Sequence, residues 1–343
     1  MTEKPLPKAA SPEHLTAALR KSSIDVRVSD VVVESSHPTI LSEITRLRPV
    51  YDGDAVGAPP TIILKTGRPD RLGDANWDAG RQEVAFYNGV AAAKPGQQLL
   101  RCFEAAWDAD TRAWHLLLED LTDTHFIATA WPLPPTMEQC ETIVRARARF
   151  HAAWWDEPRL GKSVGAWQDD ATMSQNLKGF EERLAQFSDR FGDRLPLERR
   201  QLYRRLIDTG LRLHTHHRSH RNMTVVQGDS HVWNNFLPRD GGDDVRLFDW
   251  DCWRVDVAAD DLAYMLAMHW YPDRRRRMEQ PLLDCYHAAL LESGVKGYDR
   301  GSTVRRLSPG GSLAGHHADW AGDVEYSAAD LVEQSRAHIP GRG

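Results

Sequence analysis

Three residues in the C-terminal half of the chain have the types and spacing that phosphoryl transfer to an alcohol requires. Asp229 precedes Asn234 by five positions, and Asp249 follows a mostly apolar run that begins at Val245. In such a reaction one carboxylate orients the acceptor hydroxyl and takes its proton, while a second carboxylate and an amide oxygen hold Mg²⁺ on the phosphates. The residue types and their order favour Asp229 as the catalytic base and Asn234 and Asp249 as the metal ligands.

These residues lie in a segment, residues 224–251, that has the composition of short β-strands joined by turns. The Asp-x4-Asn spacing places Asp229 and Asn234 on one short loop. A turn rich in Gly and Asp between Pro238 and Asp244 would return the chain so that Asp249 faces them. The segment therefore predicts a compact β-type unit that presents all three side chains at one place.

Alternating and β-branched patterns in the first third of the chain predict a small sheet with one inserted helix. The expected strands are residues 31–33, 39–51, 61–64, 99–107 and 114–118, and the expected helix is residues 81–90.

From Pro132 onward the pattern becomes helical, beginning with a capping box from Thr136 to Gln139. Further amphipathic helices are predicted near residues 177–187, 202–213, 262–270 and 278–291. We expect three parts: an N-terminal lobe of residues 1–118, a helical lobe of residues 119–300, and an atypical, poorly ordered tail of residues 301–343. The apolar register stops near Arg300, which favours a truncated segment or an altered reading frame, with a short helix at residues 327–337.

Composition narrows the functional classes. The 343 residues carry a net charge of -6, which argues against a nucleic-acid partner. The four cysteines form no CxxC pair, so they are interpreted as reduced thiols. The sequence has no apolar stretch of membrane-spanning length and no apolar segment near Met1, which predicts a cytoplasmic protein without a membrane partner.

The two motifs around Asp229 and Asp249 resemble those of the aminoglycoside phosphotransferase superfamily, which includes choline-kinase-like and ecdysteroid-kinase-like enzymes. The family loop is His-Gly-Asp-x-His-x-x-Asn, and residues 227–234 are Gln-Gly-Asp-Ser-His-Val-Trp-Asn. Residues 248–250, Phe-Asp-Trp, are similar to the metal motif, and the chain most resembles the bacterial ecdysteroid-kinase-like branch. Gln227 stands where the family has a histidine.

The resemblance implies an α+β, protein-kinase-like two-lobed fold and an ATP-dependent kinase that phosphorylates a small-molecule hydroxyl with Mg²⁺. It also assigns nucleotide contacts in the first lobe. Lys65 would bind the phosphates and Glu83 would hold that lysine. Residues 116–121 resemble the hinge that contacts adenine, including Glu119 and Leu121. The loop that covers the phosphates would lie near residues 34–39 and would use Ser35, Ser36 and Thr39 in place of glycines.

Two alternatives remain open from the sequence: a catalytically silent nucleotide-binding protein of the same fold, and a metal-dependent phosphohydrolase. The choice between ATP and GTP is also open. Acidic residues near the site would suit an amino sugar or another cation as acceptor, while sterol-type and choline-type acceptors also fit the resemblance.

Overall fold

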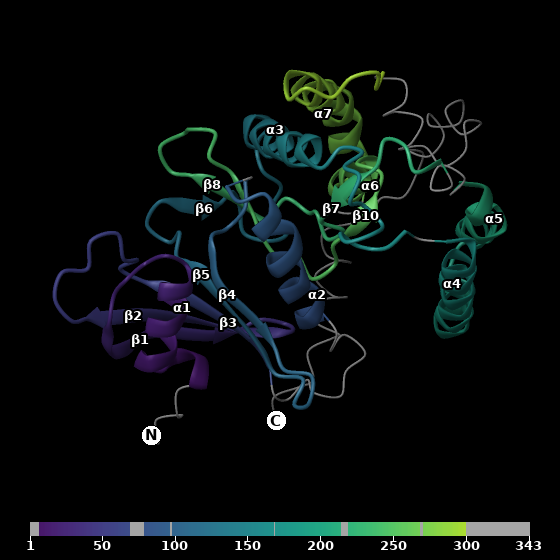
Figure 1. Cartoon of the computed structure of the whole chain (residues 1–343). Helices are drawn as coiled ribbons and strands as arrows, with labels where there is room; N and C mark the ends of the chain where they lie inside the picture. Colours follow the sequence, from purple (N-terminus) through teal and green to yellow (C-terminus); the bar gives the residue numbers. More distant parts are fainter. Residues whose placement is uncertain are drawn as a thin grey trace.

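The protein is described from a computed structural model, which covers residues 7–68, 79–96, 98–167, 169–213, 219–267 and 270–299 (Figure 1). The predicted tail at residues 301–343, with its short helix, lies outside the described residues.

The N-terminal region is built on a five-stranded antiparallel sheet with the order β1-β2-β3-β5-β4. All five strands coincide with predicted ones, although β1 is longer than the predicted residues 31–33 and β2 is shorter than the predicted residues 39–51. The strands are β1 (Val28–Pro38), β2 (Ser42–Tyr51), β3 (Ile62–Gly67), β4 (Cys102–Trp107) and β5 (Trp114–Glu119).

Helix α1 (Pro12–Lys21) covers one face of this sheet and was not predicted. Ser11 Oγ accepts a hydrogen bond from His14 N, and Pro12 occupies the first turn, so the start of the helix has a recognisable sequence signal. Leu15 and Leu19 are fully buried in a cluster with apolar residues of the sheet, which fixes α1 against the strands (Figure 1).

Helix α2 (Ala79–Ala85) continues into a π-helical segment, Phe86–Ala91, which together match the predicted helix. The segment joins the sheet to the C-terminal region. The Phe86 ring stacks on Trp250 with centroids 4.0 Å apart, and Gln82 exchanges two hydrogen bonds of 2.8 Å with Trp253.

The C-terminal region is mainly helical. Helix α3 (Met137–Ala153) begins with the predicted capping box between Thr136 and Gln139, and it packs against α7 (Pro272–Glu292). Helices α4 (Asp170–Phe191) and α5 (Leu197–Leu213) pack on each other, at the right of Figure 1. Helix α6 (Ala259–Ala267) follows the two loops that carry Asp229 and Asp249.

Five short strands hold those loops. One sheet has the order β6-β8-β9 and the other pairs β10 with β7. The strands are β6 (His125–Ile127), β7 (Thr224–Val226), β8 (Asn235–Pro238), β9 (Arg246–Leu247) and β10 (Arg254–Asp256). The antiparallel pairing of β8 with β9 confirms the predicted return of the chain toward Asp249.

The fold is therefore α+β, with a β-rich N-terminal region and a helical C-terminal region, as predicted. Among the described residues, none of the helices has both the length and the apolar character needed to cross a bilayer.

Candidate active site

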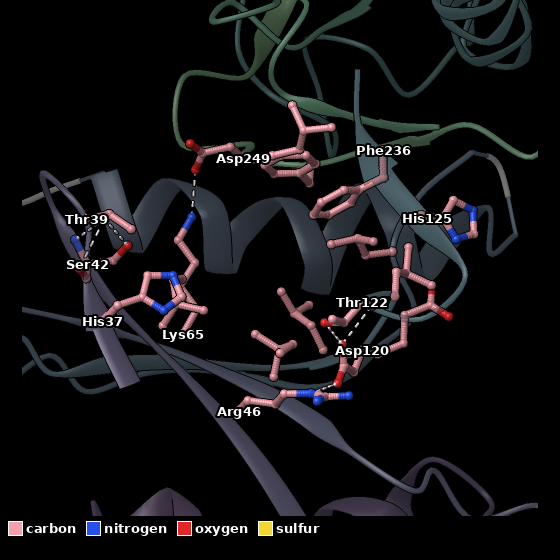
Figure 2. Close-up of a pocket in the computed structure, with 18 of the residues that line it drawn as sticks. His37, Thr39, Ser42, Arg46, Lys65, Asp120, Thr122, His125, Phe236 and Asp249 are labelled. Atoms are coloured by element: carbon pink, nitrogen blue, oxygen red, sulfur yellow. Dashed lines mark hydrogen bonds and ion pairs between the residues drawn. The ribbon is translucent and has the colours of Figure 1, made fainter. Parts of the chain in front are cut away.

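Two adjoining cavities lie where the five-stranded sheet meets the short strands. The larger cavity, about 640 Å³, has an apolar wall (Figure 2) made by Ile44, Ile63, Leu100, Leu118, Phe236 and Phe248. The smaller cavity, about 250 Å³, is lined by Asp229, His231 and Asp251 among others. Lys65, Glu83 and Asp249 line both, so one charged cluster separates a mainly apolar chamber from an acidic one.

Lys65 is the centre of this charged cluster. Its Nζ atom lies 2.7 Å from Glu83 Oε2 on α2 and 2.6 Å from Asp249 Oδ1, the contact drawn in Figure 2. Burial lowers the pKa of Lys65, but the two neighbouring carboxylates have the larger combined effect, so the pKa of Lys65 is raised. Burial, offset only in part by Lys65, raises the pKa of Glu83 to about 7. Burial by itself would raise the pKa of Asp249, but the charge and hydrogen bond of Lys65 lower it.

Asp249 has a left-handed backbone with φ of 65°, which is unusual for a residue other than glycine. Phe248 separates it from the end of β9, and about one third of its side chain is exposed. Asp251 lines the same acidic cavity, and burial together with the charge of Asp249 raises the pKa of Asp251. Two carboxylates in one acidic chamber are oxygen ligands of the kind that Mg²⁺ binds.

The loop that carries Asp229 depends on the glycine before it. Gly228 has φ of 84°, and a Cβ atom there would lie 2.4 Å from the carbonyl oxygen of Cys252. Only glycine fits this close approach. Asn234 Nδ2 donates to the Asp229 carbonyl at 2.8 Å and to Asp229 Oδ2 at 3.3 Å, which turns the amide oxygen away from Asp229. Asn234 is itself buried, 5% exposed, and lines neither cavity.

A buried polar network fixes this loop from below. Asp261 accepts hydrogen bonds from the backbone N–H of Gln227 at 3.0 Å and of Gly228 at 2.9 Å. Its carboxylate is paired with Arg147 at 2.8 Å and contacts His151 at 3.1 Å. Despite complete burial, Arg147 and His151 hold the pKa of Asp261 well below its usual range.

Gln227 connects the two motifs. Its side-chain oxygen accepts from Arg147 at 2.9 Å, and its amide nitrogen donates to the carbonyl of Phe248, the residue before Asp249. The glutamine thus uses both its acceptor and its donor at the position where the superfamily has histidine.

The sequence had not indicated the roles of Arg147, His151 and Asp261. A usable signal was present: Arg147 and His151 are four positions apart on the helix face that also carries Ile143, Val144 and Phe150. Charged or polar residues on an apolar face are buried only with partners.

Most, but not all, of the residues predicted to contact the nucleotide line one of the two cavities. Glu119, Leu121 and Ser35 line the larger cavity, and Thr39 lines both cavities. Ser36 lines neither; its hydroxyl hydrogen-bonds Glu43 at 2.9 Å and Thr45 at 3.0 Å. Adjacent residues of a strand point to opposite faces, so Ser35 and Ser36 cannot both face the cavity. The segment beside the acidic chamber is instead the hairpin turn, residues 39–42.

Sequence comparison agrees with this architecture. Residues 84–296 match the ecdysteroid kinase-like family, and the chain belongs to that family. No curated protein sequence matches the chain.

Solved structures show the same fold at low sequence identity. A candidate aminoglycoside phosphotransferase from Ralstonia eutropha is 13% identical, with a TM-score of 0.51 over 95% of this chain and 94% of that one. A variant of aminoglycoside 2'-phosphotransferase-IIIa in complex with GDP is 11% identical, with a TM-score of 0.50 over 95% of this chain and 98% of that one. Aminoglycoside phosphotransferase APH(3'')-Id from Streptomyces rimosus is 18% identical, with a TM-score of 0.47 over 86% of this chain and 95% of that one. The first two of these structures, with TM-scores of 0.51 and 0.50, show that the chain has a kinase-like phosphotransferase fold.

Proposed function

We propose that the protein is an ATP-dependent kinase that phosphorylates a hydroxyl group of a small molecule. The observation that carries this proposal is the sharing of Lys65, Glu83 and Asp249 by the two cavities. A nucleotide whose base occupies the apolar chamber would bring its phosphates to Lys65 and its terminal phosphate toward Asp229.

The nucleotide site would be divided between the two regions. Ile63, Leu118 and Phe248 offer apolar contacts for a base, beside the hinge residues Glu119 and Leu121. The hairpin turn at residues 39–42 would cover the phosphates, and Ser35 lines the larger chamber. The domain division at residue 118 would place this site between the lobes.

Asp249 would hold Mg²⁺, and Asp251 is a further carboxylate within the chamber. Asn234, which lines neither cavity, would be the second ligand through its amide oxygen, since its amide nitrogen donates to Asp229. The ion would supply charge neutralisation on the phosphates.

Asp229 would act on the acceptor. Its carboxylate would orient the acceptor hydroxyl and take its proton as the hydroxyl oxygen bonds to the γ-phosphorus and the bond to the ADP oxygen breaks. Tyr264 is a neighbour on this side, since burial and contact with Asp229 raise the pKa of Tyr264. Asn234, which donates to Asp229, would keep its carboxylate in place.

The proposal is tested with the purified protein, Mg-ATP and a panel of amino sugars, sterols, choline-type alcohols and other hydroxylated metabolites. Product masses are read for one added phosphate, and nucleotide affinity is measured separately by thermal shift. Wild type should yield an ATP-dependent product, and Asp229→Asn should lose roughly 10²–10⁴-fold in rate with little change in nucleotide affinity.

Asp243→Asn is the matched control, because this exposed carboxylate pairs with Arg149 and lines neither cavity. Its rate should equal that of wild type. An unchanged rate in Asp229→Asn would remove Asp229 as the base. Tight nucleotide binding without turnover on any acceptor would instead identify a silent member of the fold, and phosphate release without nucleotide would identify a hydrolase.

A further inference from the structure

A second cluster of ligand-type side chains lies in the N-terminal region, away from the cavities. It consists of His14 from α1, Glu104 from β4 and His115 from β5. One ligand atom of each lies within 4.8 Å of the others. No other group of three or more His, Cys, Asp or Glu residues in the described part of the chain meets this criterion.

The cluster sits on the face of the sheet opposite the nucleotide cavity. His115 shares a strand face with Leu117, which is buried in the cluster of α1. Leu118, on the alternate face, lines the larger cavity. The His14 and His115 rings meet edge to face with centroids 5.2 Å apart, so both imidazoles converge on Glu104 from different elements.

The distances are close to those of a tetrahedral metal centre. His115 Nε2 lies 3.5 Å from Glu104 Oε2, and His14 Nε2 lies 2.6 Å from the same oxygen. Metal–ligand bonds of about 2.0–2.1 Å in tetrahedral geometry separate the ligand atoms by about 3.3 Å. The distance between His115 and Glu104 already fits this value. The distance between His14 and Glu104 is too short, so their hydrogen bond would have to be replaced by one bond from each residue to the metal.

The side chain of His115 indicates that the cluster lacks a ligand. Its Nε2 atom is buried and makes no hydrogen bond to any residue that the structure describes. The neighbouring Glu104 carboxylate at 3.5 Å makes no hydrogen bond to this nitrogen, so the buried nitrogen carries a desolvation penalty, which a metal bond would remove.

Lys21 also contacts the carboxylate, at 3.3 Å from Glu104 Oε1. Its side chain is 71% exposed and is therefore free to move into solvent when a cation binds.

We propose that His14, Glu104 and His115 bind a divalent transition metal ion of the zinc type, with a water molecule as the fourth ligand. Two imidazoles and one carboxylate form a ligand set that Zn²⁺ uses, and three of its four positions would be protein ligands. The ion would connect α1 to the β4–β5 hairpin and stabilise the N-terminal region by mass action, independently of catalysis.

The proposal is tested on the full-length protein after treatment with EDTA, by calorimetric titration with Zn²⁺ and by the visible spectrum after Co²⁺ addition. One equivalent should bind, the melting temperature should rise, and Co²⁺ should show the absorption of tetrahedral coordination. His115→Gln and Glu104→Gln should each lower the affinity at least roughly tenfold, because even outer-shell partners of a metal contribute that much.

The sequence contains a competing set of imidazoles at residues 214–220, so a matched variant is needed. His214→Ala combined with His216→Ala and His217→Ala should leave the stoichiometric site and its spectrum unchanged. Loss of the bound equivalent in this triple variant, equal affinity in His115→Gln, or no binding by wild type would each overturn the proposal. In the last case, the cluster is a charged contact between α1 and the sheet.

Discussion

Asp261 and Arg147 form an ion pair 2.8 Å long in which both side chains are completely buried. The pair lies directly beneath the loop of Asp229, since Asp261 also accepts the backbone hydrogen bonds of Gln227 and Gly228. Breaking a buried pair by removal of one partner leaves an uncompensated charge, which costs about 3–5 kcal/mol.

The first prediction follows from this pair. Arg147→Met should lower the free energy of unfolding in urea by about 3–5 kcal/mol, because the Asp261 carboxylate would remain buried without the guanidinium that balances its charge. Arg145→Met is the control on the same helix: Arg145 is half exposed and pairs with Glu141 at 2.9 Å, so its loss should cost less than about 1 kcal/mol. Equal losses in the two variants would contradict the role given to the buried pair.

The second prediction concerns the glycine before Asp229. Gly228→Ala forces a Cβ against the Cys252 carbonyl at 2.4 Å, so the loop must shift and phosphoryl transfer should be lost. Gly241→Ala has a similar φ of 78° with nothing within 4 Å of the new Cβ. It should cost only the backbone strain, about 1 kcal/mol, and should retain activity. Activity and urea unfolding are measured for both. Full activity in Gly228→Ala would show that the loop has room to move.

The third prediction concerns Mg²⁺ dependence. Asp249 holds Lys65 at 2.6 Å and presents a negative charge where phosphates would bind. Asp249→Asn should bind Mg²⁺-free ADP at least about tenfold more tightly than wild type, because charges a few ångströms apart interact by several kcal/mol. Added Mg²⁺ should no longer improve its affinity. Calorimetry with EDTA or Mg²⁺ measures both effects, and an undiminished Mg²⁺ response in the variant would argue against Asp249 as a ligand.

The fourth prediction concerns pH. Burial lowers the pKa of His151 in the folded protein, while the unfolded value is about 6.5. Above pH 6.5 the ring is neutral in both states, so its contribution to stability is fully present. Below pH 6.5 the unfolded chain takes up the proton first, and the folded state loses up to about 1.4 kcal/mol per pH unit.

The measurement is the difference in unfolding free energy between wild type and His151→Gln from pH 7.5 to 5. Other titrating groups are common to both proteins and cancel in this difference. Wild type should lose stability relative to the variant as the pH falls. A difference independent of pH would mean that His151 titrates alike in both states.

The sequence was most informative where the residues of the site are close together along the chain. Asp229 and Asn234 lie on one loop, and a single turn returns Asp249 to them, so short-range patterns were sufficient to place these three residues near one another. The strands of the N-terminal sheet were predicted for a similar reason, since their alternation is local.

Long-range pairing was not accessible in this way. Asp261 meets Arg147 across 114 positions, and Glu104 meets His14 across 90, so neither contact leaves a short-range pattern. Ser36 shows a different difficulty: a shift of one residue in a strand changes the face, and the phosphate-loop resemblance did not fix that register. Helix α1 was missed although Ser11 and Pro12 carry its capping signal.

The attachment of α2 has a consequence for how ligands enter and leave. This helix contacts β4 and β5, and the Gln82–Trp253 hydrogen bonds fix it to the C-terminal region. The π-helical segment that continues it is fixed to the same region by the Phe86–Trp250 stack. A hinge motion that widened the cleft at this side would have to break those contacts together. For the proposed kinase, nucleotide exchange would then proceed through local movement of the β1–β2 turn, with the relative orientation of the two regions preserved.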